Sequence, residues 1–377
     1  MHLMRSDLAR IPGLVRGVGL SLMALLAISC GGSDGAGGTG GSGGAGPYEG
    51  VPRDLPPLVV PTDTWTWIDV PESQCDDGTP TGFAVNRHDP GAAGDDLFIF
   101  FQGGGACWDY TTCFALNTST HGPIGRAQWD ALEPTLPAPF DRTRASNPFR
   151  DATMVFIPYC TGDLHVGDNV VTYPQGFTTY HKGRPNTIAY LSRIASTWTN
   201  PTRVIYSGSS AGGYGATLSY DLARRTFPAA RMYLIDDAGP LLEGDAVPAA
   251  EKTAWIAAWN IGALADGLCD ACRTDLSGTY PALVKRFPHD RMALLSSLQD
   301  QTIRTYFMLM PAVFQTDILQ LVAHRLDPTT TFRSFLIDGA QHTLLGSMTT
   351  STTAGVVLEP WLDQMVNDRD GWTSVKP

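Results

Sequence analysis

The chain has 377 residues, of which 43% are hydrophobic and 17% are charged, and its formal net charge is −11 at pH 7. This composition is that of a globular protein and excludes a fully disordered chain. The sequence contains no run of basic residues, which argues against nucleic acid as a partner.

The N-terminus has the pattern of a secretory signal. Three arginines precede the apolar stretch GLSLMALLAISC, which is too short to span a bilayer and ends in small residues. Its last residues resemble the lipid-attachment motif of bacterial lipoproteins, although Ala27 stands where leucine is usual. We therefore expect a signal peptide over residues 1–29 and a lipidated Cys30, with an ordinary cleaved signal as the alternative.

A segment rich in glycine and serine follows and completes residues 30–47. Such a composition is typical of a flexible tether that holds a domain away from a membrane. No later stretch is apolar enough to span a membrane, so we expect contact with the membrane only through the lipid. The expected location is the bacterial cell envelope, at the periplasmic or surface face of the outer membrane.

Residues 48–377 read as one catalytic domain in which buried strands alternate with helices. Two alternating segments predict half-buried antiparallel strands at 64–70 and 81–88. Continuous apolar runs predict buried strands at 96–101, 153–158, 203–207, 231–235, 304–310 and 332–337. Helices are predicted at 187–198, 213–226, 249–265 and 317–325. This order predicts an α/β fold, a doubly wound and mostly parallel sheet of the α/β-hydrolase type with helices on both faces.

The stretch RVIYSGSSAGGYGA, residues 203–216, has the pattern of a nucleophile elbow. Gly208-Ser209-Ser210-Ala211-Gly212 is a G-x-S-x-G motif between a predicted strand and a predicted helix. The residues two positions before and after the serine must be tiny, because the strand and the helix would otherwise collide. The alternative is a plain glycine-rich turn. The context favours Ser210 as a nucleophile.

A nucleophilic serine needs a base and an acid, which follow it in the chain order of this fold. His342 lies just after the last predicted strand and is the expected base, with His289 and His324 as rivals. The acid orients the imidazole and stabilises its charge. Asp317 is the expected acid because it follows the predicted strand at 304–310, and Asp237, after the strand at 231–235, is the alternative.

The oxyanion of the reaction needs preorganised N–H donors. Three glycines, Gly103, Gly104 and Gly105, directly follow the predicted strand at 96–101, where a loop of this fold faces the elbow. We expect Gly104, Gly105 and Ala211 to form the oxyanion hole. A phosphate-binding loop is the alternative, but neither of the usual glycine patterns for such a loop is present.

With Cys30 assigned to lipid, six cysteines remain, and an exported chain meets an oxidising compartment that favours disulfides. The alternative for Cys269 and Cys272 is half of a zinc site or a redox motif, for which no partner motif or βαβ context is found. We expect neither a metal nor a cofactor.

Several segments together resemble the pectin acetylesterases, a family that also includes an animal lipid esterase. The segments run in the family's order from Cys75 to Leu345: CDDGTP, GGGACW, YCTGD, HKGRPN, GSSAGGYGA, DDAG and DGAQHTLL. The resemblance implies Ser210 and His342 directly, and Asp317 through DILQL. It also implies the disulfides Cys75–Cys160 and Cys107–Cys113, which leaves Cys269 with Cys272.

The resemblance bears on the pocket as well. Family members carry a tryptophan before the cysteine of the glycine loop, whereas Trp108 follows Cys107 here, so we expect an altered pocket wall and acyl preference. Asp163 and His165 are expected near the pocket rim, with ordinary loop residues as the alternative. Arg184, together with Lys182 and Arg126, could supply positive charge to a polyanionic substrate.

These observations predict a serine esterase that removes acyl groups, in the first place O-acetyl groups, from pectin or another polysaccharide through an acyl-enzyme. The runner-up is a deacylase of lipid esters or thioesters. A third hypothesis, an inactive surface relative that binds carbohydrate, would expect a replaced serine or histidine, and both are present. The oligomeric state is not indicated by the sequence.

Overall fold

The computed structural model describes residues 50–89, 95–262 and 268–377. The predicted signal peptide, Cys30 and the tether lie outside the described residues, as does the end of the helix predicted at 249–265. All described residues belong to the unit Ala45–Pro377. Within these ranges we find no helix with the length and apolarity that a membrane span requires.

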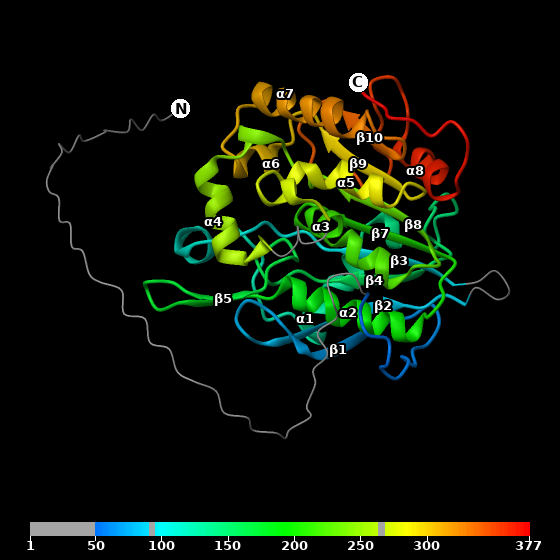
Figure 1. The fold of residues 1–377 in the computed structure, drawn as a ribbon. Helices are drawn as coiled ribbons and strands as arrows, with labels where there is room; N and C mark the ends of the chain where they lie inside the picture. Colours follow the sequence, from blue (N-terminus) through cyan, green and yellow to red (C-terminus); the bar gives the residue numbers. More distant parts are fainter. Residues whose placement is uncertain (1–49, 90–94, 263–267) are drawn as a thin grey trace, which may run out of the picture. The chain divides into compact units, whose positions relative to one another are not determined.

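A central sheet with the strand order β1-β2-β4-β3-β7-β8-β9-β10 organises the described chain (Figure 1). β1 and β2 pair antiparallel, as do β2 and β4, and all the other neighbours pair parallel. The strands are β1 (Trp65–Gln74), β2 (Pro80–Asn86), β3 (Asp96–Phe101), β4 (Thr153–Ile157), β7 (Arg203–Ser209), β8 (Arg231–Asp237), β9 (Arg291–Ser297) and β10 (Phe332–Ile337). A separate hairpin consists of β5 (Asn169–Thr172) and β6 (Thr178–His181).

Helices pack on both faces of the sheet. They are α1 (Arg126–Leu132), α2 (Gly183–Thr197), α3 (Ala211–Thr226), α4 (Ala249–Trp259), α5 (Thr279–Arg286), α6 (Gln301–Tyr306), α7 (Pro311–Leu321) and α8 (Leu358–Val366). Short helical turns connect them: η1 (Thr111–Ala115), η2 (Glu133–Thr135), η3 (Ala138–Phe140), η4 (Gly244–Ala246), η6 (Asp270–Arg273), η7 (Leu276–Gly278) and η8 (Val322–Leu326).

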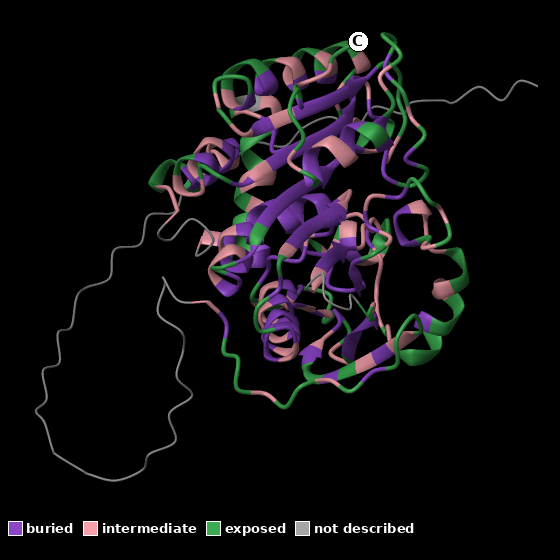
Figure 2. Ribbon diagram, turned by 90° about the vertical axis from the view of Figure 1, so that its right-hand side faces the viewer, coloured by how far each residue is buried: buried purple, intermediate pink, exposed green. Residues whose placement is uncertain are grey.

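Two apolar cores lie on opposite faces of the sheet because successive side chains of a strand point to opposite sides. In β3, Leu97, Ile99 and Phe101 join the core that includes α2, α3, α5 and α7, while Phe98 and Phe100 join the core that includes α1 and α8. The strands β2, β3, β4 and β7 to β10 are consequently buried along nearly their whole length, whereas the edge strand β1 is only partly buried (Figure 2). The predicted α/β class with a mostly parallel sheet is confirmed.

One predicted strand is wrong. Residues 304–310 contain the end of α6 and a turn, and the strand before β10 is instead β9, Arg291–Ser297. The apolar run at 304–310 misled because its side chains face two environments: Phe307 is buried, but Met308 and Met310 are exposed. The side chain of Asp300 also accepts hydrogen bonds from the first free N–H groups of α6, which favours a helix there.

Candidate active site

Ser210 lies at the junction of β7 and α3, in a strained conformation with φ 57° and ψ −124°. Its neighbours explain the glycines of the motif. A Cβ at Gly208 would collide with the carbonyl oxygen of Gly212, and a Cβ at Gly212 would collide with that of Phe101. The backbone of this turn therefore tolerates no side chain at either position, and the serine is held out of the sheet.

His342 lies in the loop after β10, and its Nδ1 is 2.8 Å from Oδ2 of Asp300. Asp300 is fully buried, and its Oδ1 accepts the N–H groups of Thr302 and Ile303 at 2.9 Å each. A carboxylate held in this way fixes the imidazole tautomer and ring orientation. The pair is the arrangement that a general base requires.

The expected acid, Asp317, is therefore wrong, because Asp300 is the carboxylate that pairs with His342. Asp317 lies on α7, and its Oδ2 is buried with no hydrogen-bond partner among the described residues. Burial raises the pKa of Asp317. The error follows from the misplaced strand, since the acid comes directly after β9 and not after residues 304–310.

Asp237, the alternative acid, binds the backbone of the histidine loop instead of the imidazole. Its carboxylate accepts the Ser209 hydroxyl at 2.6 Å and the N–H groups of Leu344 and Leu345 at 2.8 and 3.1 Å. Burial raises the pKa of Asp237, and these hydrogen bonds oppose the rise. Asp237 thereby ties the nucleophile elbow to the loop that carries His342.

The two rival histidines have other surroundings. His324 pairs with Glu243 at 2.8 Å, and His289 is exposed. His342, in contrast, pairs with the buried Asp300 and lies in the loop that Asp237 ties to the elbow, so the geometry favours His342 as the base.

The glycine loop passes directly over the elbow. A Cβ at Gly103 would lie 2.9 Å from the Cβ of Ser210. Gly105 and Ala211 line the same cavity as Ser210, and in the described part of the chain their N–H groups donate to no protein acceptor. The carbonyl of Gly104 accepts the Thr120 N–H at 2.7 Å, and Gly104 does not itself line the cavity. Free N–H groups beside a serine are what a developing oxyanion needs.

An apolar cavity of about 280 Å³ opens beside Ser210. Three tryptophans form part of its wall: the ring centroid of Trp255 lies 5.5 Å from that of Trp108 and 5.7 Å from that of Trp259. Other lining residues are Leu164, Val166, Leu218, Leu241, Leu242, Val247, Ile256 and Phe307. The charged residues of the lining are Lys252, Arg273 and Asp275. Trp108 thus contributes to the pocket wall.

Asp163 and His165 are not at the pocket rim. Both are buried, and Asp163 accepts the Thr161 hydroxyl and the N–H groups of His165 and Gly183. Burial raises the pKa of Asp163 to about 7 and lowers that of His165 to about 4. The His165 ring bonds the Gln102 carbonyl at 2.8 Å, so these side chains support the glycine loop from behind.

The three cations expected for a polyanionic substrate do not line the cavity. Lys182 pairs with Asp168 at 2.9 Å, and Arg126 pairs with Asp130 at 3.0 Å. Arg184 is the second residue of α2, and burial lowers its pKa. The cavity therefore gains no positive charge from any of them.

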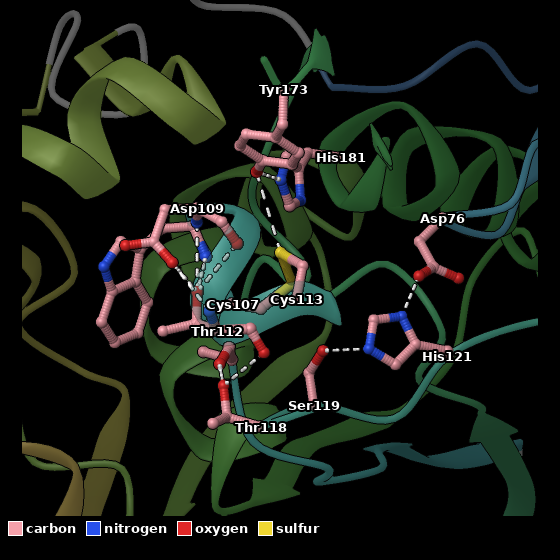
Figure 3. The surroundings of a disulfide bond; sticks show 12 residues. Asp76, Cys107, Asp109, Thr112, Cys113, Thr118, Ser119, His121, Tyr173 and His181 are labelled. Atoms are coloured by element: carbon pink, nitrogen blue, oxygen red, sulfur yellow. Dashed lines mark hydrogen bonds and ion pairs between the residues drawn. A yellow bond between two sulfur atoms is a disulfide. The ribbon is translucent and has the colours of Figure 1, made fainter. Parts of the chain in front are cut away.

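The three expected disulfides are present: Cys75–Cys160, Cys107–Cys113 and Cys269–Cys272. Figure 3 shows the second of them between the glycine loop and η1. Cys269 and Cys272 bond each other, which leaves neither thiolate to bind zinc. Disulfides fit export to an oxidising compartment.

The profile of the Pectinacetylesterase family matches residues 64–314, more than half of the chain. The chain belongs to the pectinacetylesterase family. Family membership and the relatives below support a carboxylic ester hydrolase.

Two curated relatives of this family member are animal enzymes. The palmitoleoyl-protein carboxylesterase NOTUM of Schmidtea mediterranea is 27% identical over 153 residues, 40% of this chain and 28% of that protein. The palmitoleoyl-protein carboxylesterase notum1a of Danio rerio is 25% identical over 148 residues, 39% of this chain and 29% of that protein. The matched region thus spans less than a third of the length of either relative.

Solved structures of the Wnt deacylase Notum from Drosophila share the fold. One crystal form has a TM-score of 0.61 at 16% identity and covers 84% of this chain and 95% of that chain. A second form has a TM-score of 0.56 at 17% identity and covers 80% and 92%. The pectinacetylesterase member described here has the same α/β-hydrolase-like architecture.

Two features of the candidate site were not predicted from the sequence. Asp300 was overlooked because RMALLSS was not recognised as a buried strand. Its position three residues after that strand was the available signal. The loop-binding role of Asp237 had no sequence signal, since its partners Leu344 and Leu345 are more than 100 residues away.

Proposed function

We propose that the protein is a serine carboxylesterase in which Ser210, His342 and Asp300 form the catalytic triad. The Ser210 hydroxyl attacks the ester carbonyl and His342 takes its proton, while Asp300 stabilises the imidazolium. The N–H groups of Gly105 and Ala211 stabilise the oxyanion. His342 then protonates the leaving alcohol, and water hydrolyses the acyl-enzyme by the reverse sequence. An inactive carbohydrate-binding role has no support in this geometry.

The acyl group we propose is a long apolar chain, and the cavity beside Ser210 carries this proposal. Each buried methylene contributes about 0.8 kcal/mol, so a chain that enters the cavity gains roughly fourfold in binding per carbon. An acetyl group would leave the cavity unfilled. The runner-up from the sequence, a deacylase of lipid esters or thioesters, is therefore preferred to an acetylesterase.

Two further observations support this substrate class. The cations expected for pectin pair with the chain's own carboxylates or lie away from the cavity. The curated relatives are also named as esterases of the palmitoleoyl group. An acetylated polysaccharide remains the competing substrate to be tested.

The test is the hydrolysis of nitrophenyl acetate, butyrate, octanoate and palmitate by the purified mature protein. We expect kcat/KM to rise from acetate to octanoate or beyond. A preference for acetate over all longer chains would refute the long-chain assignment and restore the acetylesterase.

A matched pair of variants assigns the preference to the cavity. Val247 lines the cavity, whereas Val357 is exposed and is not part of the lining. Val247→Phe should fill part of the cavity and shift the preferred acyl length downward, because the larger side chain takes up space that a long acyl group would occupy. Val357→Phe should leave the chain-length profile of the wild type unchanged. Equal profiles in both variants would mean that the acyl chain binds elsewhere.

We further propose that the protein acts at the bacterial cell envelope, anchored by a lipid on Cys30. The signal-like N-terminus and the three disulfides support export. Metabolic labelling with a clickable fatty acid should mark the wild type but not Cys30→Ser, and only the wild type should fractionate with membranes. Labelling of both proteins, or of neither, would contradict the anchor.

A further inference from the structure

A second aspartate–histidine pair lies outside the proposed triad (Figure 3). Nδ1 of His121 hydrogen-bonds Oδ2 of Asp76, and its Nε2 lies 3.3 Å from the hydroxyl of Ser119. Oδ1 of Asp76 accepts the Gly122 N–H at 2.7 Å. Asp76 therefore holds both the side chain and the backbone of the segment that carries His121.

This pair is fixed to the fold from the other side. Asp76 directly follows Cys75, which is bonded to Cys160, and the N–H of Asp76 donates to the Cys160 carbonyl at 2.7 Å. Asp76 is only 5% exposed. The Asp76 carboxylate is thus fixed in position and anchors the segment 118–122 through hydrogen bonds.

The same segment pairs with the glycine loop. The Thr120 N–H donates to the Gly104 carbonyl at 2.7 Å, and Ser119 lies opposite Gly105 in an antiparallel bridge. A Cβ at Gly105 would collide with the carbonyl oxygen of Thr118. With backbone packed on backbone this closely, a shift of the segment must also shift the N–H of Gly105.

Ser119 is not a second nucleophile. It is 8% exposed, and it occupies the bridge instead of a strained turn. Its hydroxyl points toward the imidazole of His121 in Figure 3. Ser119 is also not among the residues that line the cavity beside Ser210. The chain Asp76–His121–Ser119 is therefore a support and not a site of reaction.

We propose that Asp76 and His121 are positioning residues that hold the oxyanion N–H of Gly105 in place for the attack by Ser210. This inference rests on the proposed esterase function. It predicts a defect in transition-state stabilisation, which is common to all esters, and not in the binding of the acyl chain.

The test compares His121→Phe with His88→Phe in the full mature protein. Phenylalanine keeps the ring against Phe114 but removes both hydrogen bonds. His88 is the matched control, because it also pairs with an aspartate, Asp63, but lies away from the glycine loop. We expect His121→Phe to lower kcat about 10- to 100-fold for short and long esters alike, with little change in KM. His88→Phe should stay within about twofold of the wild type.

Hydrogen exchange measures the position of the loop without activity. Peptides that cover residues 102–107 and 118–122 should exchange faster in His121→Phe than in the wild type or His88→Phe. If His121→Phe does not fold, Asp76→Asn replaces it, and a partial loss of kcat is expected because the amide still offers one acceptor. Unchanged kcat and unchanged exchange in the folded variant, or a loss confined to KM, would overturn the inference.

The two proposals can fail separately. If the wild type cleaves no ester, the proposed function fails, while the exchange of the glycine loop still decides whether His121 positions it. If the wild type is an active esterase and His121→Phe equals it, only the positioning role fails.

Discussion

Two histidines of this protein bond a buried aspartate through Nδ1, yet the two pairs have different surroundings. His342 and Asp300 follow the carboxyl ends of the parallel strands β10 and β9. The loop that carries His342 is tied through Asp237 to the strained elbow of Ser210, which lines the cavity. His121 lies in the bridged segment 118–122 with the buried Ser119, and Asp76 holds it from the region of the Cys75–Cys160 disulfide. The same three residue types therefore support chemistry only where the backbone exposes the hydroxyl and leaves N–H donors free beside it.

The largest effect should come from the two serines of this comparison. Ser210→Ala should lower kcat by about 10⁴- to 10⁶-fold on activated esters, because the nucleophile is lost. Ser119→Ala should lose less than about tenfold, since only one hydrogen bond of the support is removed. Steady-state kinetics on nitrophenyl esters measures both. Comparable losses of kcat in Ser210→Ala and Ser119→Ala would mean that the two serine–histidine–aspartate groups do not differ in role.

The next largest effect should come from the carboxylate that pairs with His342. Asp300→Asn should lower kcat about 10⁴-fold, the loss that this exchange causes in a serine-protease triad, because the wrong tautomer of His342 is favoured. Asp317→Asn is the control at the position first expected from the sequence and should stay within about threefold. Activity retained by Asp300→Asn but lost by Asp317→Asn would restore the original assignment.

A smaller effect is expected at Asp237, which holds the backbone of the histidine loop. In Asp237→Asn an amide donor would face one of the N–H groups of Leu344 and Leu345, at a cost of about 1–3 kcal/mol of stability. We expect a lower Tm and a roughly tenfold lower kcat, with KM retained. Ser209→Ala, which removes one partner of Asp237, should cost less than Asp237→Asn in both measurements. A full loss of activity in Asp237→Asn with an unchanged Tm would instead indicate direct participation in the reaction.

The smallest effect is a pH dependence of stability at the supporting pair. The hydrogen bond to Asp76 raises the pKa of His121, burial partly opposes this, and Asp77 also faces the imidazole. His181 also interacts electrostatically with His121, and burial lowers the pKa of His181 to about 4. Because the folded-state pKa of His121 lies above its unfolded value of about 6.5, the pair contributes its stability below that pH.

That stability is lost as the pH rises through the raised pKa of His121. The difference in unfolding free energy between the wild type and His121→Phe, from urea titrations, should therefore be largest near pH 5 and shrink above neutrality. His88→Phe should show no comparable trend. A difference that grows with pH would show that His121 is held in its neutral form.

Local sterics made the elbow predictable from sequence. Gly208 and Gly212 are required by contacts within a few residues or with the adjacent strand, so the turn can be recognised from the motif alone. Besides β7, which leads into the elbow, six strands of the sheet were predicted correctly from continuous or alternating apolar residues. The position of the acid was not predictable in this way, because the apolar run at 304–310 and the buried strand at 291–297 are similarly apolar in sequence.

The cavity was outside the reach of the sequence for a different reason. Its wall combines Trp108 from the glycine loop, Leu164 from the loop before the hairpin, Trp255 from α4 and Phe307 after α6. These segments come together only through the tertiary fold. The disulfides were expected from the family resemblance, which implies a pair of cysteines that are far apart in the sequence.

The contact between Gly212 and the carbonyl of Phe101 has a consequence for how this enzyme can change. It places the helix that begins at the nucleophile directly against the strand that leads into the glycine loop. The spacing between the attacking oxygen and the oxyanion donors is thus set by main chain against main chain, whatever side chains surround it. In the function that we propose, acyl selectivity would instead depend on cavity side chains from α4 and the segment after α6. Selection or design can therefore replace one wall of the pocket after another and explore new substrates while the reaction geometry is inherited unchanged.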